Sequence, residues 1–321
     1  MTQHVAYGLD SHCAEAVRMI RELIEQPTAD VHFVPGGTQT NLIACSLALR
    51  PWEAVVATHL GHVSTHETGA IEATGHKVFT VTSPDGKMRI AGIESALHEN
   101  RTEHMVVPKL VYISNTTEVG TQYTRQELED ISTFCRAHNL YLFLDGARLA
   151  SALSSPVNDL TLADIARLTD MFYIGATKAG GLFGEALVLL NDALKPNVRH
   201  LIKQRGALMA KGWLMGIQFE VLMQGNLIFE LGSHANKMAI ILKAGLEACG
   251  IRFAWPSESN QQFPIMKDSM IAELRKHFAF DTIERLPNGT SIVRFCTSWA
   301  TEEEECHRFV EVLKRIAASA A

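Results

Sequence analysis

Short apolar segments alternate with amphipathic stretches along most of the chain. Residues 11–25 place Ala14, Val17, Ile20 and Ile24 on one stripe at helical spacing, which predicts an amphipathic helix. The apolar segments are short enough for buried strands and lie at 54–57, 77–81, 110–113, 140–144, 171–176 and 185–190. This alternation is typical of an α/β chain that folds around a mainly parallel sheet.

The pattern changes beyond residue 200. A helix is predicted from Ile202 to Met223, a long linking helix around 208–232, and another helix from His234 to Cys249. Short strands and helices then alternate, at 252–254, 262–266, 270–277, 291–296 and 302–318. We therefore expect a large domain over residues 1–232, which includes the linking helix, and a small α+β domain over residues 233–321.

Two neighbouring predicted strands end in residues that can do chemistry. The strand at 140–144 ends at Asp145, and the strand at 171–176 leads into Thr177, Lys178 and a glycine-rich turn. In open α/β sheets the carboxyl ends of the strands face the ligand crevice. We therefore expect Asp145 and Lys178 to reach one crevice, together with Arg148, which follows Asp145 by three residues.

This trio fits a carbonyl cofactor. A lysine at a strand end can form a Schiff base with such a cofactor. Pyridoxal phosphate also needs a carboxylate near its ring nitrogen, and an arginine can clamp a substrate carboxylate. The alternative is an aspartate that caps a helix beside a surface lysine. We favour the cofactor because the three residues follow two strand ends in order.

Two further stretches carry candidate chemistry. Gly36, Gly37 and Thr38 precede a predicted helix, and free N–H groups there can bind phosphate, although glycines before a helix are also common turn chemistry. His62 and His66 would share one helix face, which could suggest a metal. No HExxH pattern and no evident third ligand accompany them, so we predict no metal site.

Composition excludes several classes of protein. The chain has 321 residues, of which 47% are hydrophobic and 20% charged, and its net charge of −6 supplies no basic field for nucleic acid. No apolar run is long enough to span a bilayer, and the first residues do not read as a signal peptide. The six cysteines form no CxxC pair. These features predict a cytoplasmic globular protein.

The segments LDGARL and TK before the glycine-rich turn resemble those of pyridoxal-phosphate-dependent threonine aldolases, within the β-eliminating lyase group. The resemblance extends from about Tyr7 to Trp299. It implies an aspartate-aminotransferase-type fold with a mainly parallel sheet in the large domain. It also implies that Lys178 holds pyridoxal phosphate, that Asp145 faces the ring nitrogen and that Arg148 binds the substrate carboxylate.

The same resemblance implies roles for other residues. The step at Gly36, Gly37 and Thr38 would hold the cofactor phosphate, with Asn41 also matching. A histidine motif of the family is matched by His62, Glu67, Gly69 and Ala70. It implies that His62 stacks on the ring and carries a proton, whereas His66 makes local hydrogen bonds.

Two basic regions resemble further family features. The segment VRFCTSW implies a second carboxylate-binding arginine at Arg294, the alternative being an exposed residue at a strand edge. The family supplies a basic group to the phosphate, often from another subunit, and Lys203, Arg205 and Lys211 are the candidates. A solvated helix face is the alternative for these three. The resemblance thus implies a homodimer or homotetramer with shared active sites.

The chain also departs from the family. Thr117 stands where the family usually has a histidine near the substrate β-hydroxyl. Family members also usually begin with additional residues near the substrate, so we expect a chain that is short at this end. Either this start lies too late, or the protein lacks part of the active-site wall.

We expect a lyase that cleaves a β-hydroxy-α-amino acid, such as threonine, allo-threonine or phenylserine, into glycine and an aldehyde. His62, His66 or a water would take the hydroxyl proton, and the sequence does not choose among them. The alternatives are β-elimination or racemisation on the same scaffold, or a non-catalytic phosphate-binding α/β protein.

Overall fold

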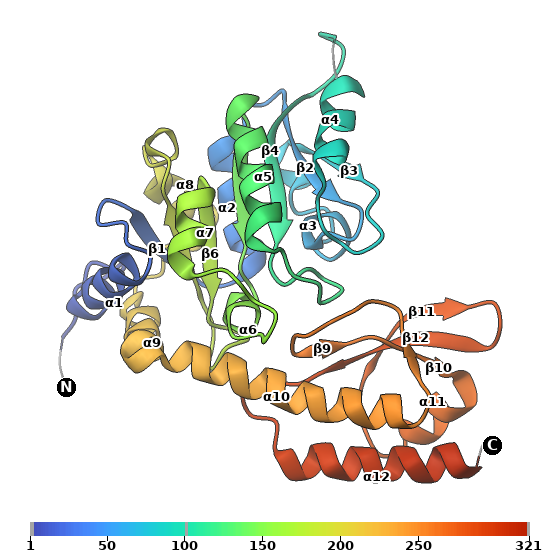
Figure 1. Ribbon diagram of the computed structural model, residues 1–321. Coiled ribbons are helices and arrows are strands. Elements are labelled where there is room, and N and C mark those ends of the chain that lie inside the picture. The colour runs from blue at the N-terminus through green and yellow to red at the C-terminus, as the bar shows by residue number, and fades with distance from the viewer. Residues whose placement is uncertain (1–2, 100–101, 320–321) are drawn as a thin grey trace.

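A seven-stranded sheet forms the centre of the molecule in the computed structural model, which describes residues 3–99 and 102–319 (Figure 1). The strand order across the sheet is β1-β7-β6-β5-β4-β2-β3. The strands are β1 Asp30–Val34, β2 Glu53–Thr58, β3 Lys77–Val81, β4 Val107–Ser114, β5 Tyr141–Asp145, β6 Met171–Gly175 and β7 Glu185–Leu189. The predicted α/β class is confirmed.

The direction of the strands brings several segments to one edge of the sheet. Strands β3, β2, β4, β5 and β6 pair in parallel, so their carboxyl ends lie together. Strand β7 is antiparallel to both β6 and β1, and Glu185 at its beginning pairs with Gly175 and with Val34. The end of β1, the beginning of β7 and the ends of β4, β5 and β6 therefore border the same crevice.

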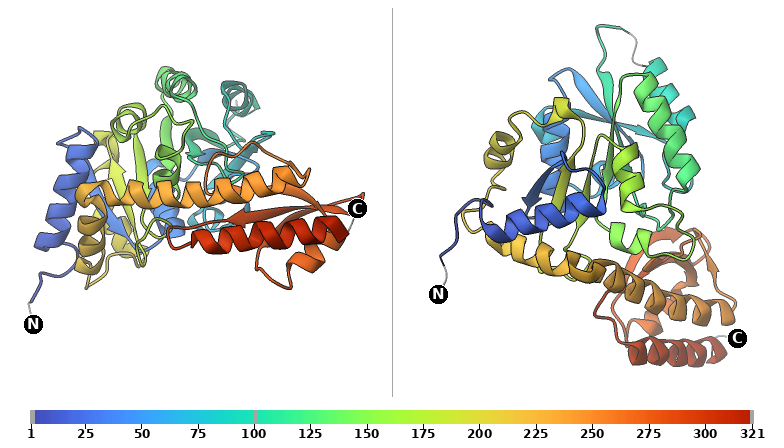
Figure 2. Two further views of the ribbon diagram at one scale, coloured as in Figure 1. Left: turned by 60° about the horizontal axis from the view of Figure 1, so that its bottom comes forward. Right: turned by 60° about the vertical axis from the view of Figure 1, so that its left-hand side comes forward.

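Helices cover both faces of this sheet, and alternate strand residues pack against each layer (Figures 1 and 2). Helix α2 lies on the face to which Tyr112, Phe143 and Tyr173 point. The helices of the large domain are α1 Ser11–Leu23, α2 Gly37–Ala48, α3 His62–Thr65, α4 Ile90–Glu99, α5 Arg125–Ala137, α6 Leu149–Leu153, α7 Leu162–Leu168, α8 Val198–Gln204 and α9 Trp213–Met223.

A long helix, α10 (Leu227–Ala248), runs from the large sheet to a second, smaller sheet, as Figure 1 shows. The antiparallel strand order there is β11-β12-β10-β8, with β9 paired to β12. Its elements are β8 Arg252–Phe253, β9 Gln261–Gln262, β10 Pro264–Lys267, α11 Asp268–Leu274, β11 Asp281–Leu286, β12 Thr290–Cys296 and α12 Glu303–Ser319. The expected boundary at 232/233 falls inside α10.

The predicted helix from Ile202 to Met223 is wrong, because the chain leaves the helical path after α8. Gly206 has a φ of +72°, and the N–H of Ala207 donates to the Ile202 carbonyl at 2.9 Å. This bond closes the helix as a Schellman-type end, which a glycine in the left-handed conformation permits.

The linking helix expected around 208–232 is also wrong as one piece. It is interrupted after α9, where Gly225 and Asn226 have φ values of 60° and 63°. Strand β11 was not predicted from the sequence, because its segment DTIERL is mostly exposed and polar and lacks the pattern of a buried strand.

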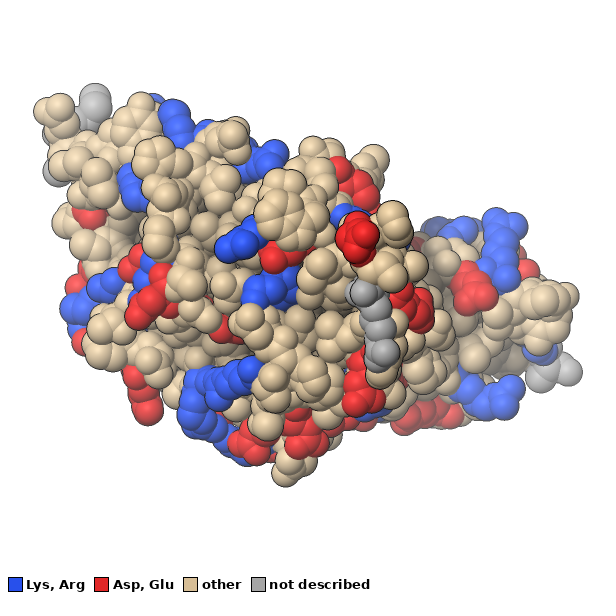
Figure 3. Space-filling view, turned by 90° about the horizontal axis from the view of Figure 1, so that it is seen from above, with Lys and Arg blue, Asp and Glu red and all other residues tan. Residues whose placement is uncertain are grey.

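The described helices carry no sign of a membrane-spanning segment, and neither sign of charge dominates the face shown in Figure 3. None of the described helices is both long and apolar enough to cross a membrane. Acidic and basic side chains are interspersed on the face of the molecule that Figure 3 shows, in keeping with a net charge of only −6.

Candidate active site

A cavity of about 240 Å³ opens at the edge of the sheet where the strands converge. Its walls come from the ends of β4, β5 and β6, the beginning of β7 and the segment that leads into α2. The sequence-predicted residues on these walls are Gly36, Gly37, Thr38, Asn41, His62, Thr117, Asp145, Arg148 and Lys178. The structure thus brings most of the predicted site together in one cavity.

Four donors hold the buried carboxylate of Asp145. The hydroxyls of Tyr112 and Tyr173 donate to it at 2.6 and 2.5 Å, and the N–H of Ala147 donates at 3.0 Å. The side-chain amide of Asn41 donates at 3.2 Å, while also donating to Glu67 at 2.6 Å. The carboxylate is therefore fixed by neighbours from β4, β6 and α2.

Lys178 follows the end of β6 and lines the same cavity. Burial lowers the pKa of its amine, and the positive charge of Arg148 lowers it further. A lysine with a lowered pKa carries more of the neutral amine, which is the form that attacks a carbonyl. The side chain is therefore suited to covalent attachment of a carbonyl cofactor.

The two predicted carboxylate-binding arginines differ in their surroundings. Arg148 lines the cavity, and its buried Nε has no partner among the described residues. Its Nη2 lies 3.9 Å from the Cys296 sulfur. Arg294 instead lines a neighbouring cavity and forms an ion pair with Asp281. Arg148 is therefore the arginine available at the site, and the role of Arg294 stays a prediction.

The N-terminus of α2 faces the cavity without a cap. Gly36 precedes the helix and, within the described chain, no side chain caps it. A Cβ on Gly36 would meet nothing within 4 Å, whereas one on Gly37 would lie 3.2 Å from the Tyr173 hydroxyl oxygen. Uncapped N–H groups at the start of a helix form a site for an anion such as phosphate.

His62 begins α3 and its ring is held in place. The Nδ1 atom lies 2.8 Å from the carboxylate of Glu67, and this hydrogen bond raises the pKa of the imidazole. His66 is exposed and is not among the cavity residues, although its ring centroid lies 5.6 Å from that of His62. The structure thus places one of the two predicted histidines at the site.

The three predicted phosphate-binding cations lie outside this cavity. Arg205 donates to the Ser46 hydroxyl at 3.0 Å, and the Lys203 amine lies over the Tyr7 ring at 5.1 Å. Lys211 is exposed in the segment between α8 and α9. None of them is among the cavity residues of its own chain, so their role stays a prediction.

Sequence analysis missed two carboxyls on the cavity wall. Burial raises the pKa of Glu118 to about 7 and that of Glu185 to about 8. The sequence signal for Glu118 is its place after the end of β4, directly beside Thr117. Glu185 was missed because only the antiparallel direction of β7 brings its first residue to this edge.

Tyr112 and Tyr173 were missed as well. Both lie inside strongly apolar strands and are indistinguishable there from core residues. Only the fold shows that their hydroxyls meet at Asp145.

Comparison with solved structures supports this fold. The chain superposes on Leishmania major threonine aldolase with a TM-score of 0.98 and 80% identity, over 99% of this chain and 93% of that one. It also superposes on Thermus thermophilus aspartate aminotransferase with a TM-score of 0.70 and 17% identity, over 98% and 84% of the two chains. The expected aminotransferase-type fold is confirmed.

Comparison of sequences points to the same group of proteins as the comparison of structures. The chain is 31% identical to a low-specificity L-threonine aldolase of Pseudomonas sp. (strain NCIMB 10558), over 93% of this chain and 86% of that protein. It is 28% identical to its counterpart from Pseudomonas aeruginosa, over 97% and 90%. The model of the β-eliminating lyase family matches residues 1–269. The chain therefore belongs to the β-eliminating lyase family, alongside the low-specificity threonine aldolases.

Proposed function

We propose that this protein is a pyridoxal-phosphate-dependent threonine aldolase, which cleaves a β-hydroxy-α-amino acid into glycine and an aldehyde. The observation that carries the proposal is the meeting of Lys178, Asp145 and Arg148 on the wall of one cavity. The names of the relatives in Pseudomonas and Leishmania support the same reaction. Cleavage of a carbon–carbon bond makes the protein a lyase.

The residues of the cavity fit pyridoxal phosphate. The uncapped start of α2, at Gly36, Gly37 and Thr38, suits its phosphate, and Lys178 suits its carbonyl. Asp145 suits its ring nitrogen. Asn41 makes the longest of the four hydrogen bonds to Asp145, at 3.2 Å, so this is the bond that a ring N–H would replace most easily. When bound, the cofactor supplies a ring that accepts the electron pair of the broken carbon–carbon bond.

The other residues position the substrate. Arg148 offers a partly buried guanidinium whose Nε has no partner among the described residues, which suits the α-carboxylate of an amino acid. Fixing that carboxylate limits the rotation of the substrate about Cα and so selects which bond is oriented for cleavage. Arg294 would need to leave Asp281 to take part. The hydrogen bond to Glu67 fixes the orientation of the His62 ring, which suits stacking against the cofactor ring.

We also propose that the active site is completed by a second copy of the chain. This rests on the family resemblance and on Lys203, Arg205 and Lys211, which lie outside the cavity of their own chain. We further propose that the chain divides into a large domain of residues 1–232 and a small domain of residues 233–321.

We propose a cytoplasmic location as well, because the six cysteines are free thiols, which a reducing compartment favours.

Substrate choice follows from Thr117, which is smaller than the histidine usual in the family. The room beside it should admit bulky β-substituents. We expect phenylserine to have a higher kcat/KM than threonine when the two compete for the purified holoenzyme. A strong preference for threonine over every aromatic analogue would contradict this expectation.

The cofactor assignment is tested by the Lys178→Ala variant. The purified wild-type protein should absorb visible light when loaded with pyridoxal phosphate, and borohydride should fix the cofactor to the chain. The variant should lose the borohydride-stable adduct in the mass spectrum and nearly all release of glycine from threonine. The exposed Lys276→Ala serves as the matched control and should keep both. A Lys178→Ala protein with normal turnover would refute the assignment.

The shared site is tested by mixing two inactive variants, Lys178→Ala and Lys211→Ala. If Lys211 acts in the active site of a neighbouring subunit, a dimer of one Lys178→Ala chain and one Lys211→Ala chain has one site with both lysines intact. Co-refolded mixtures should then regain aldolase activity that neither variant has alone. Sedimentation of the fully active holoenzyme as a monomer, or no recovery in hybrids confirmed by mass spectrometry, would show that the site is not shared.

A further inference from the structure

Cleavage of the substrate requires a group that takes the proton of its β-hydroxyl. Such a base must lie on the cavity wall, have a lone pair free for the substrate and be able to exchange its proton near neutral pH. Thr117, the two histidines and the two buried glutamates are the polar side chains to weigh.

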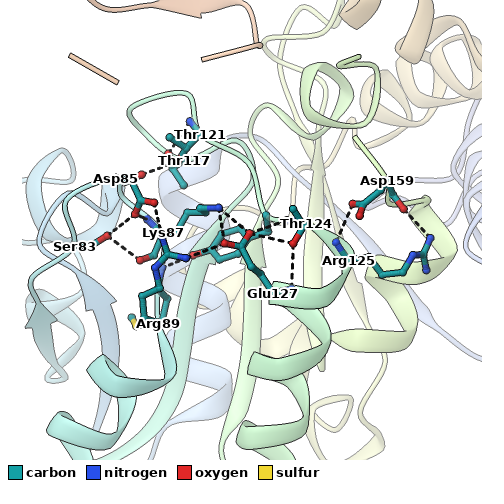
Figure 4. Close-up of polar contacts among 12 residues, drawn as sticks. Ser83, Asp85, Lys87, Arg89, Thr117, Thr121, Thr124, Arg125, Glu127 and Asp159 are labelled. Carbon is teal, nitrogen blue, oxygen red and sulfur yellow. Dashed lines mark hydrogen bonds and ion pairs between the residues drawn. The ribbon is translucent and has the colours of Figure 1, made fainter. Parts of the chain in front are cut away.

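The hydroxyl of Thr117 is engaged in its own loop. Its Oγ1 lies 2.7 Å from Thr121 Oγ1 and accepts from the Thr121 N–H at 3.2 Å. The Thr121 hydroxyl in turn donates to the Asp85 carbonyl at 2.6 Å, and Figure 4 shows Thr117, Thr121 and Asp85 grouped together. Thr117 thus closes a turn, and an aliphatic hydroxyl barely ionises in any case.

The histidines are poorly suited to the role. The hydrogen bond that the His62 ring makes to the Glu67 carboxylate raises the pKa of His62, which favours its protonated form. His66 is exposed and lies outside the set of cavity residues. Of the two glutamates, Glu185 accepts a hydrogen bond from the Thr177 hydroxyl at 2.9 Å. Burial also raises its pKa, to about 8, so it holds its proton more tightly than Glu118 does.

Glu118 meets all three requirements. It lines the cavity together with Lys178 and Arg148. The Ser114 hydroxyl lies 3.0 Å from both carboxylate oxygens, and the backbone N–H of His62 donates to Oε1 at 3.0 Å. These contacts fix the carboxylate and leave a lone pair of Oε2 for a substrate hydroxyl, because Oε2 receives only the Ser114 contact among those described.

The surrounding charges place Glu118 near the ideal strength for a base. Burial raises the pKa of its carboxyl to about 7, the charge of Asp145 adds to the rise, and Ser114 and His62 oppose it. Burial raises the pKa of the Tyr112 and Tyr123 phenols, and the charge of Glu118 adds to both rises. A general base acts best when its pKa lies near the working pH.

We propose that Glu118 is the catalytic base that accepts the β-hydroxyl proton, an inference that rests on the proposed aldolase function. The O–H bond breaks and its proton passes to Glu118, while the oxygen electron pair forms the aldehyde C=O bond. The electrons of the Cα–Cβ bond stay with Cα, which takes up one proton to become glycine. Glu118 then releases the proton that it received, so protons and electrons balance.

The test replaces the carboxylate by its isosteric amide in Glu118→Gln, which can still accept from Ser114 and from the His62 N–H. Threonine cleavage should fall by about 10²–10⁴-fold, the usual contribution of a general base. Exchange of the α-proton of glycine in D₂O involves no β-hydroxyl and should continue at the wild-type rate. Glu284→Gln, on exposed β11, is the matched control.

Each outcome decides. Lost cleavage with retained exchange supports the proposal, and wild-type cleavage by Glu118→Gln overturns it. Equal loss of cleavage and exchange also overturns it, because the residue would then serve the site as a whole. If the wild-type protein itself does not cleave threonine or phenylserine, the proposed function fails instead.

A second readout needs no turnover. Infrared difference spectra of the cofactor-free protein, taken on either side of neutral pH, should show a carboxyl that titrates near pH 7 and is missing in Glu118→Gln. In the holoenzyme, kcat/KM should rise with pH through the same range, because the ionised carboxylate is the base, and the variant should lose this rise. A wild-type spectrum without such a carboxyl would contradict the assignment.

Discussion

The buried carboxylate of Asp145 is the interaction on which the rest of the site depends. A charge taken out of water is strongly unfavourable unless hydrogen bonds compensate it, and here Tyr112, Tyr173 and Asn41 all donate to it. These donors come from β4, β6 and α2, so the carboxylate ties the centre of the sheet to the helix whose start faces the cavity. Burial, together with the nearby charge, raises the pKa of both tyrosines and keeps them as donors.

The direction of the strands explains how distant segments of the chain reach this carboxylate. Parallel β4, β5 and β6 deliver Glu118, Asp145 and Lys178 after their carboxyl ends, and antiparallel β7 contributes Glu185 at its beginning. The cavity therefore gathers three acids and one amine in little space. Burial, together with the charge of Asp145, raises the pKa of Glu118 and of Glu185, so both carboxyls can carry a proton near neutral pH.

Residues that follow strand ends could be predicted from sequence, because buried strands and glycine-rich turns leave clear patterns. This covers Asp145, Lys178 and the step at Gly37. Contacts across the sheet could not be predicted, because Tyr112 looks like any core residue and no pattern in the sequence distinguishes Glu118 from the polar residues beside it. The break between α8 and α9 depends on Gly206 in a left-handed conformation, which a helical period does not reveal.

We expect the Asp145 carboxylate, once pyridoxal phosphate is bound, to make the cofactor ring an effective electron sink. The most direct measurement compares cofactor binding and threonine cleavage in the wild type and in Asp145→Asn, which keeps the shape of the side chain. We expect the variant to bind pyridoxal phosphate, as followed by its visible absorbance. We expect its kcat to fall by roughly 10²-fold or more, the effect of removing a preorganised electrostatic contact. Full turnover by Asp145→Asn with the cofactor bound would show that the ring does not depend on this carboxylate.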